Sequence, residues 1–187
     1  NNMSGLTLKQ ANAIVEGAIA KAHEMKIKPL AVVVLDAAGN IVSAQREDNA
    51  SMFRMDVALG KAWGAVAMGC SSRALGKRAK DNPNFFLSLA STAHGKFLPQ
   101  TGAALIKDAQ GNILGAAGAS GGTGDEDEAC CAAGIEKAGL QVGDTFIFDH
   151  WYDAGRLLAP GESVGVTIVR DGASFRAELP TTARPVE

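Results

Sequence analysis

The chain has 187 residues, of which 47% are hydrophobic and 20% are charged, and its formal net charge is −2. These values are typical of a soluble globular protein that buries its own core, and they exclude a disordered or fibrous chain. There is no Lys/Arg cluster and no apolar run of membrane-spanning length, so we expect no nucleic-acid and no membrane partner. The N-terminus lacks a signal-peptide pattern, and Cys70, Cys130 and Cys131 lack disulfide or zinc spacing, which favours the cytoplasm.

A helix and a hairpin are predicted for the first part of the chain. Thr7 and Gln10 form a capping box, and apolar residues then recur at helical spacing until Pro29 stops the pattern. The β-branched run 30–35, a turn that contains glycine and the apolar run 41–44 follow. This order is typical of two antiparallel strands joined by a short loop.

The hairpin pattern occurs a second time. Leu35-Asp-Ala-Ala-Gly-Asn-Ile-Val42 is matched by Lys107-Asp-Ala-Gln-Gly-Asn-Ile-Leu114, and apolar strands at 103–106 and 113–117 flank the second copy. Each copy predicts one hairpin. The sequence therefore predicts an α+β fold whose sheet is mainly antiparallel and has at least four strands.

The segment 52–68, between the two hairpins, is predicted to be a helix with two apolar faces. Such a helix packs between two layers. We expect one face to cover the sheet and the other to meet a second subunit, which makes the chain a homo-oligomer. The two faces consist of Met52, Met55, Leu59, Ala62, Trp63 and Val66, and of Phe53, Val57, Gly64 and Met68.

The composition changes after residue 140. The segment 141–187 contains half of the ten aromatic residues, and the apolar runs 164–169 and 174–179 flank an Asp-Gly pair, a strong hairpin signal. A segment of this size cannot build its own core. We therefore divide the chain into a main domain, 1–140, and a β-rich extension that docks on it or on a neighbouring subunit.

Three motifs, covering about three quarters of the chain, carry a family resemblance. They are Val32-Val-Val-Leu-Asp-Ala-Ala-Gly-Asn40 running into Arg46-Glu-Asp-Asn-Ala50, the helix with Lys61-Ala-Trp63, and Gly111-Asn-Ile-Leu-Gly-Ala-Ala-Gly-Ala-Ser-Gly-Gly122 followed by Asp127-Glu128. In this order they resemble the GlcG/HbpS-like family, also known as haem-degrading-type or DUF336 proteins, and the C-terminal domain of some PduO-type proteins. The resemblance implies a profilin-like antiparallel sheet flanked by helices, assembly into dimers or larger rings, and haem or iron binding as in some members. Asn49 stands where the family usually has glycine, and the segment after residue 140 is not part of the common module.

A glycine-rich segment, 118–124, leads from a strand into a predicted helix that Thr123 caps and that continues to about residue 137. Free backbone N–H groups at a helix N-terminus can hold an anion such as a carboxylate or a haem propionate. We assign this role to Gly121 and Gly122. A well-capped turn without a ligand is the alternative.

Acidic residues crowd the first turn of the same helix. Asp125 and Glu128 are three residues apart on one helix face, and the pair resembles iron-binding pairs of haem-binding relatives. They form a candidate metal site, although two carboxylates alone are a weak one. Solvated capping acids are the alternative. Asp127 is a candidate ligand-binding residue beside the glycines.

Five further residues are candidates for the site. Arg46 and Asp48 follow the first hairpin, where an arginine suits the recognition of a carboxylate, although the two could simply pair with each other. Lys61, if desolvated at a subunit interface, could act as a base. His23 is the candidate axial ligand for haem, and His150 lies in a polar-aromatic segment that could close a pocket.

Three functional hypotheses remain open from the sequence. The first is a binding protein that holds haem or a similar carboxylate-bearing molecule between the glycine-rich helix start and basic residues. The second is a cofactor-independent isomerase, lyase or hydrolase for a small organic acid or enol, in which Arg46 binds the carboxylate and Lys61 or His150 moves the proton. The third is an accessory subunit with a vestigial pocket.

Overall fold

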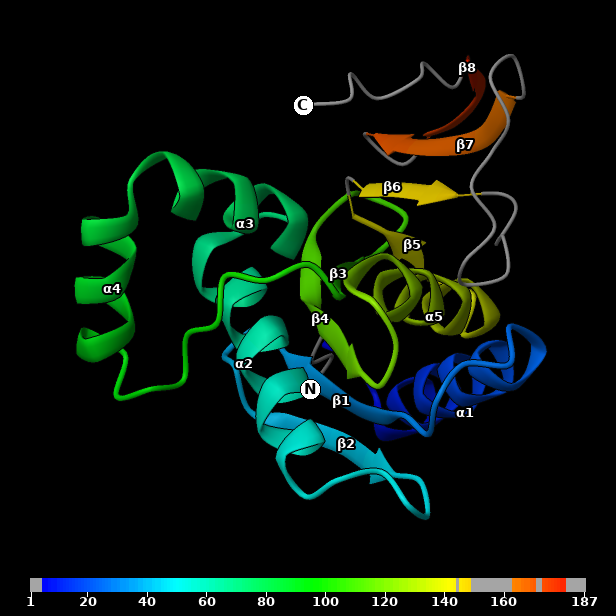
Figure 1. Cartoon of the computed structure of the whole chain (residues 1–187). Helices are drawn as coiled ribbons and strands as arrows, with labels where there is room; N and C mark the ends of the chain where they lie inside the picture. Colours follow the sequence, from blue (N-terminus) through cyan, green and yellow to red (C-terminus); the bar gives the residue numbers. More distant parts are fainter. Residues whose placement is uncertain (1–4, 144, 149–162, 171–172, 181–187) are drawn as a thin grey trace.

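The computed structural model describes residues 5–143, 145–148, 163–170 and 173–180, which form five helices and eight strands (Figure 1). The helices are α1 (Leu8–Glu24), α2 (Phe53–Met68), α3 (Ser72–Asp81), α4 (Pro83–Thr92) and α5 (Gly124–Lys137). The strands are β1 (Ala31–Asp36), β2 (Ile41–Arg46), β3 (Ala103–Lys107), β4 (Ile113–Ser120), β5 (Gln141–Val142), β6 (Thr145–Phe148), β7 (Ser163–Arg170) and β8 (Ala173–Pro180). In this described part of the chain, none of the helices has the length and apolar character of a membrane span.

Five strands form one antiparallel sheet in the order β2-β1-β4-β3-β5. The two predicted hairpins are β1–β2 and β3–β4, and they lie side by side because β1 pairs with β4. Helices pack on both faces of this sheet. The predicted α+β fold with an antiparallel sheet is therefore confirmed.

The repeated sequence makes the same turn in both hairpins. Asp36 Oδ1 accepts the backbone N–H groups of Ala38 and Asn40, each at 2.9 Å. Asp108 Oδ1 accepts the N–H of Asn112 at 2.8 Å in the same way. The glycine of each turn has a positive φ, 81° in the first and 83° in the second, which glycine adopts without strain. The aspartate and the glycine of the repeat therefore form the same turn in both hairpins.

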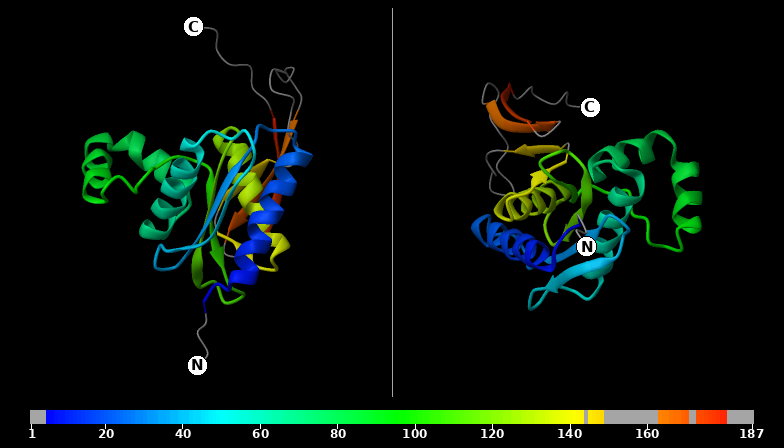
Figure 2. Two further views of the ribbon diagram at one scale, coloured as in Figure 1. Left: turned by 90° about the horizontal axis from the view of Figure 1, so that it is seen from below. Right: turned by 180° about the vertical axis from the view of Figure 1, so that it is seen from behind.

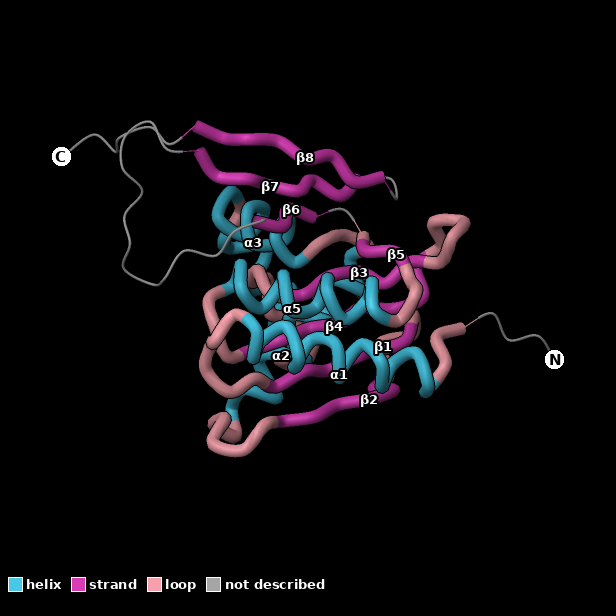
Figure 3. The backbone as a smooth tube through the Cα atoms, turned by 90° about the vertical axis from the view of Figure 1, so that its right-hand side faces the viewer, coloured by secondary structure: helices cyan, strands magenta, loops and turns pink. Residues whose placement is uncertain are grey.

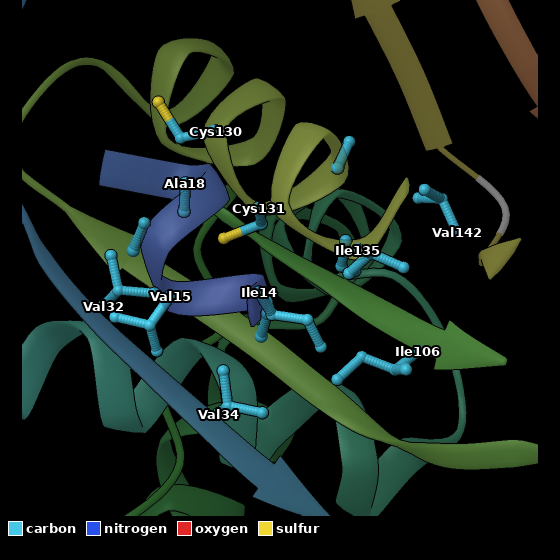
Figure 4. Close-up of a cluster of buried hydrophobic side chains, with 14 of the residues drawn as sticks. Ile14, Val15, Ala18, Val32, Val34, Ile106, Cys130, Cys131, Ile135 and Val142 are labelled. Atoms are coloured by element: carbon cyan, nitrogen blue, oxygen red, sulfur yellow. The ribbon is translucent and has the colours of Figure 1, made fainter. Parts of the chain in front are cut away.

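The sheet lies between two helical layers (Figures 2 and 3). Val32 and Val34 of β1 point to the side of α1 and α5, where they join a cluster that Figure 4 shows around Ile14. Val33 and Leu35 point to the opposite side, where α2 covers them. The continuous apolar run of β1 therefore marks a central strand that is covered on both faces.

Helices α1 and α5 approach each other closely at a glycine, which gives a test of the packing. A Cβ atom on Gly134 would lie 2.2 Å from the carbonyl oxygen of Ile14. We expect Gly134→Ala to lower the free energy of unfolding in urea by about 1–3 kcal/mol, because backbone would have to move. The matched control is Gly64→Ala in α2, whose new methyl group would contact Leu75 and Phe97 at an ordinary 3.5 Å. Equal stability of the two variants would contradict the close crossing.

The C-terminal part of the second apolar face of α2 packs within the chain. Met68 contacts a cluster of Leu75, Phe86 and Phe97, which α3, α4 and the segment after α4 supply. The sequence predicted no element in the region that supplies this cluster. Because the same chain covers this part of α2, the interface prediction is wrong for it. Phe53, at the start of the same helix, remains 64% exposed.

The C-terminal segment contributes to two sheets. Strand β5 pairs with β3, so residues 141–142 complete the main sheet. Strands β6, β7 and β8 form a second, three-stranded antiparallel sheet, in which β7 and β8 are the two strands expected from the sequence. The connecting pair 171–172 lies outside the described residues. The division of the chain at residue 140 stays a prediction.

Two of the three cysteines are core residues. Cys130 and Cys131 lie buried on α5, close to α1 and the sheet (Figure 4). Burial raises the pKa of the Cys130 thiol to about 12 and that of Cys131 well above its ordinary value. Both side chains therefore remain thiols at neutral pH and act as small apolar groups, as expected.

Candidate functional site

A groove of about 450 Å³ lies beside α2, and we call it the α2 groove. Arg54, Val57 and Lys61 line it from one face of that helix, at positions i, i+3 and i+7. The end of β4, the start of α5 and the segment before β3 complete it, through Ser120, Gly122, Gly124, Asp125, Asp127, Leu98, Gln100 and Thr101. The volume is in the range of small-molecule sites.

A buried ion pair lies at the wall of the groove. Lys61 is only 5% exposed, and its Nζ atom lies 2.9 Å from Asp127 Oδ2 and 3.0 Å from the carbonyl oxygen of Ala119. Gly102, with a φ of 129°, leaves room for this ammonium group, since a Cβ atom there would lie 2.5 Å from Nζ. The chain itself therefore desolvates Lys61, without the subunit interface that the sequence suggested.

The glycine N–H groups at the start of α5 already bind a carboxylate of the chain itself. The N–H of Gly122 donates to Asp127 Oδ1 at 2.9 Å. Burial raises the pKa of Asp127, although Lys61 and the neighbouring N–H groups lower it. A Cβ atom on Gly121 would lie 2.7 Å from the carbonyl oxygen of Pro29, so this glycine serves a close backbone contact. Asp127 thus occupies the position at Gly122 that we had assigned to a ligand carboxylate.

The predicted metal pair is bound by an arginine. Arg73 of α3 donates from Nε to Glu128 Oε2 at 2.9 Å, and its Nη2 atom also contacts Asp125 and Glu128. Burial lowers the pKa of Arg73, but the two carboxylates raise it more, so the pKa lies above its ordinary value. Within the described residues, no three His, Cys, Asp or Glu side chains gather to hold a metal ion. Asp125 and Glu128 therefore anchor α3 to α5 through a guanidinium group.

Arg54 is the site residue that sequence reasoning missed. Its side chain is half-buried at the groove, and Nη1 donates to Ser120 Oγ at 3.3 Å. It has no salt bridge to any carboxylate among the described residues, unlike Arg73. The available signal was its position seven residues before Lys61, which places both cations on one helix face.

Arg46 and Asp48 lie at the same end of the sheet but do not line the α2 groove. Ala31 pairs with both Arg46 and Ser120, so Arg46 lies two strands from Ser120, about 10 Å at the usual strand spacing. Its Nη1 atom donates to the carbonyl oxygen of Ala50, and Asp48 is exposed. The alternative considered from the sequence, a pair between Arg46 and Asp48, is not formed.

His23 also lies outside the groove. Its side chain is 67% exposed, and Nε2 lies 2.5 Å from Glu47 Oε1. The other oxygen of Glu47 accepts the N–H of Leu30 at 2.7 Å, which fixes the carboxylate. His150, the remaining predicted residue, is outside the described residues.

The motifs, the fold and the groove can now be compared with known proteins. Residues 6–136 match the sequence profile of a family described as "haem degrading protein HbpS-like". The chain belongs to the HbpS-like family. The resemblance found from the three sequence motifs is therefore confirmed. Among curated proteins, none matches this chain.

Solved structures agree with the HbpS-like assignment. A structure described as HbpS is 26% identical, with a TM-score of 0.63, and the match covers 73% of this chain and 92% of that one. A PduOC–haem complex is 24% identical, with a TM-score of 0.65 and coverages of 73% and 96%. The Klebsiella pneumoniae protein ORFY, of family DUF336, is 22% identical, with a TM-score of 0.64 and coverages of 74% and 96%. The last two likenesses concern the fold alone.

Proposed function

We propose that this HbpS-like protein is a cytoplasmic binding protein for haem or a similar carboxylate-bearing small molecule, and that Arg54 binds the carboxylate in the α2 groove. The observation that carries the proposal is a half-buried guanidinium group that has no carboxylate partner among the described residues. A guanidinium group binds a carboxylate through two parallel hydrogen bonds and desolvates more easily than an ammonium group. The neighbouring Lys61–Asp127 pair is internally neutralised, so Arg54 supplies the free positive charge.

Haem binding needs a partner for the propionates and a ligand for the iron, and the α2 groove supplies only the first. The propionates suit Arg54, but no described residue lining the groove is an imidazole, thiol, thioether or phenol that could ligate iron. His23 resembles a metal-binding histidine, because Glu47 holds one ring nitrogen and the side chain is 67% exposed. Glu47 contacts Leu30, which adjoins Ala31, and Ala31 pairs with Ser120 at the groove, so His23 and Arg54 approach the same end of the sheet. Haem binding would therefore draw its axial donor from outside the groove.

Titration with haemin tests this proposal. We expect a Soret band that saturates at one haem per chain and that His23→Ala removes, since His23 would supply the axial nitrogen. The matched control is His94→Ala, because His94 is also exposed and does not line the groove. No Soret change in the wild type would exclude haem and leave other carboxylates as the ligand class.

An enzyme acting on a small organic acid or its enol is the second candidate. The buried Lys61–Asp127 pair favours it, because a desolvated acid and base beside a pocket are typical of proton transfer. In deuterated water, such an enzyme would exchange the C3 protons of small 2-oxo acids, which are adjacent to the carbonyl group, faster than buffer does, and proton NMR detects this exchange. Exchange at the buffer rate across a panel of acids would favour the binding protein.

We also propose that the chain self-associates, which yields a further prediction. Met52 and Phe53 near the start of α2 and Phe85 and Leu87 on α4 are large apolar side chains that are 49–75% exposed. Exposed apolar groups of this size often mark protein interfaces. Light scattering should give at least the mass of a dimer, and Phe53→Ser combined with Leu87→Ser should lower it. A monomeric wild type at micromolar concentration would contradict this proposal.

A further inference from the structure

A second hollow, of about 470 Å³, adjoins the α2 groove. Residues of α3 and of the segment 99–101, the stretch that leads into β3, line it. Gln100 and Thr101 line both hollows, so the two spaces share a polar wall. A single extended molecule could therefore contact both.

The second hollow is basic. Arg73, Lys77 and Lys80 line it from α3, at positions i, i+4 and i+7, which lie on one helix face. None of the described lining residues is an aspartate or glutamate. The expectation that the chain has no Lys/Arg cluster is therefore wrong for this helix. We call this space the basic hollow.

Two of these three cations lack a partner within the described structure. Arg73 is bound by Asp125 and Glu128, whereas Lys77 and Lys80 form no salt bridge there. Like charges one helical turn apart repel each other, so the free protein carries an unfavourable interaction that an anion would remove. Gly76 also lines the hollow, and a Cβ atom there would lie 3.5 Å from the carbonyl oxygen of Pro99, so the missing side chain leaves space between α3 and the segment 99–101. Uncompensated positive charge beside open space is the chemistry of an anion site.

We propose that the basic hollow binds a second anionic group of the ligand whose first carboxylate binds Arg54. The inference rests on the proposed function, and it narrows the ligand class to dicarboxylates and similar dianions. Lys77 and Lys80 neutralise the second group, and the side chains of Gln100 and Thr101 offer hydrogen bonds to the polar part between the two groups. Binding involves no covalent step.

Pairs of probes that differ by one carboxylate test the inference by calorimetry. The first pair is suberate and octanoate, and the second is mesoporphyrin and its monomethyl ester, which contain no iron. We expect each dianion to bind about tenfold more tightly than its partner, as for one additional charge-assisted hydrogen bond. The double variant Lys77→Gln/Lys80→Gln should remove this gain and leave the affinity for the monoanions unchanged.

The control variant is Lys9→Gln/Lys28→Gln, which removes the same charge from exposed positions outside both hollows. It should keep the tenfold gain, which separates a local site from an effect of net charge. If monoanions bind and dianions gain nothing, or if Lys77→Gln/Lys80→Gln preserves the gain, the inference is overturned and the proposed function stands. If neither member of either pair binds, the proposed function fails as well.

Discussion

Replacing Lys61 by methionine is expected to lower the free energy of unfolding by about 3–5 kcal/mol, because it leaves a buried charge without its partner. Methionine fills the space of the lysine stem but cannot donate to Asp127 or to the carbonyl oxygen of Ala119. Asp127 would then remain buried with only backbone N–H groups such as that of Gly122. Urea unfolding followed by circular dichroism measures the loss.

The pH dependence of this loss of stability shows whether the buried carboxylate of Asp127 causes it. Burial already raises the pKa of Asp127, and removal of the Lys61 cation raises it further. The folded variant then binds a proton that the unfolded chain releases, so its stability falls as pH rises from the unfolded pKa, about 3.9, toward the folded one. The difference between wild type and Lys61→Met should therefore be larger at pH 8 than at pH 5.

A double variant, Lys61→Met with Asp127→Leu, provides the control. Replacing both members of a buried pair by apolar residues is often neutral or stabilising. We expect the double variant to regain most of the stability and to lose the pH dependence. If it remains as unstable as the single variant, the cost comes from packing around Gly102 and not from the charge.

The main sheet was predictable because its signals are local. The aspartate and the glycine of each repeated turn act within five residues, and a capping box begins both α1 and α5 as expected. Helices α3 and α4 have weaker start signals, namely a Ser71 cap without a capping box and Pro83 in the first turn. Helix α3 is predominantly polar, and its core contact rests on Leu75, which meets Phe97 from a segment more than 20 residues away. A helix whose core contacts come from distant segments has only a weak hydrophobic pattern in its own sequence.

The site was only partly predictable, because pairing in space decides which charges are free. Lys61, Gly122 and Asp127, which are all candidate residues from the sequence, do meet at the groove. Their charges, however, satisfy one another, and Arg73 satisfies the acids of α5 from another helix. The charged residues can be identified from the sequence, but which of them form ion pairs in the folded chain cannot.

The choice between Arg54 and Arg46 gives the last prediction. We expect Arg54→Gln to weaken the binding of mesoporphyrin by about 10- to 100-fold, since a hydrogen bond to a charged group contributes about 1.5–3 kcal/mol. Glutamine keeps a polar side chain at this half-buried position, so stability should change little. Fluorescence titration measures the affinity, and thermal unfolding checks the fold.

Arg46→Gln is the matched control, because the same charge is removed about two strands away, at the end of β2. If the ligand lies in the α2 groove, this variant keeps wild-type affinity. The opposite outcome, a loss in Arg46→Gln and none in Arg54→Gln, would place the carboxylate at Arg46, the arginine that the sequence favoured. Arg46 ends β2, whereas Arg54 lies on α2 and contacts Ser120 at the end of β4, so the pair of variants locates the ligand without a structure of the complex.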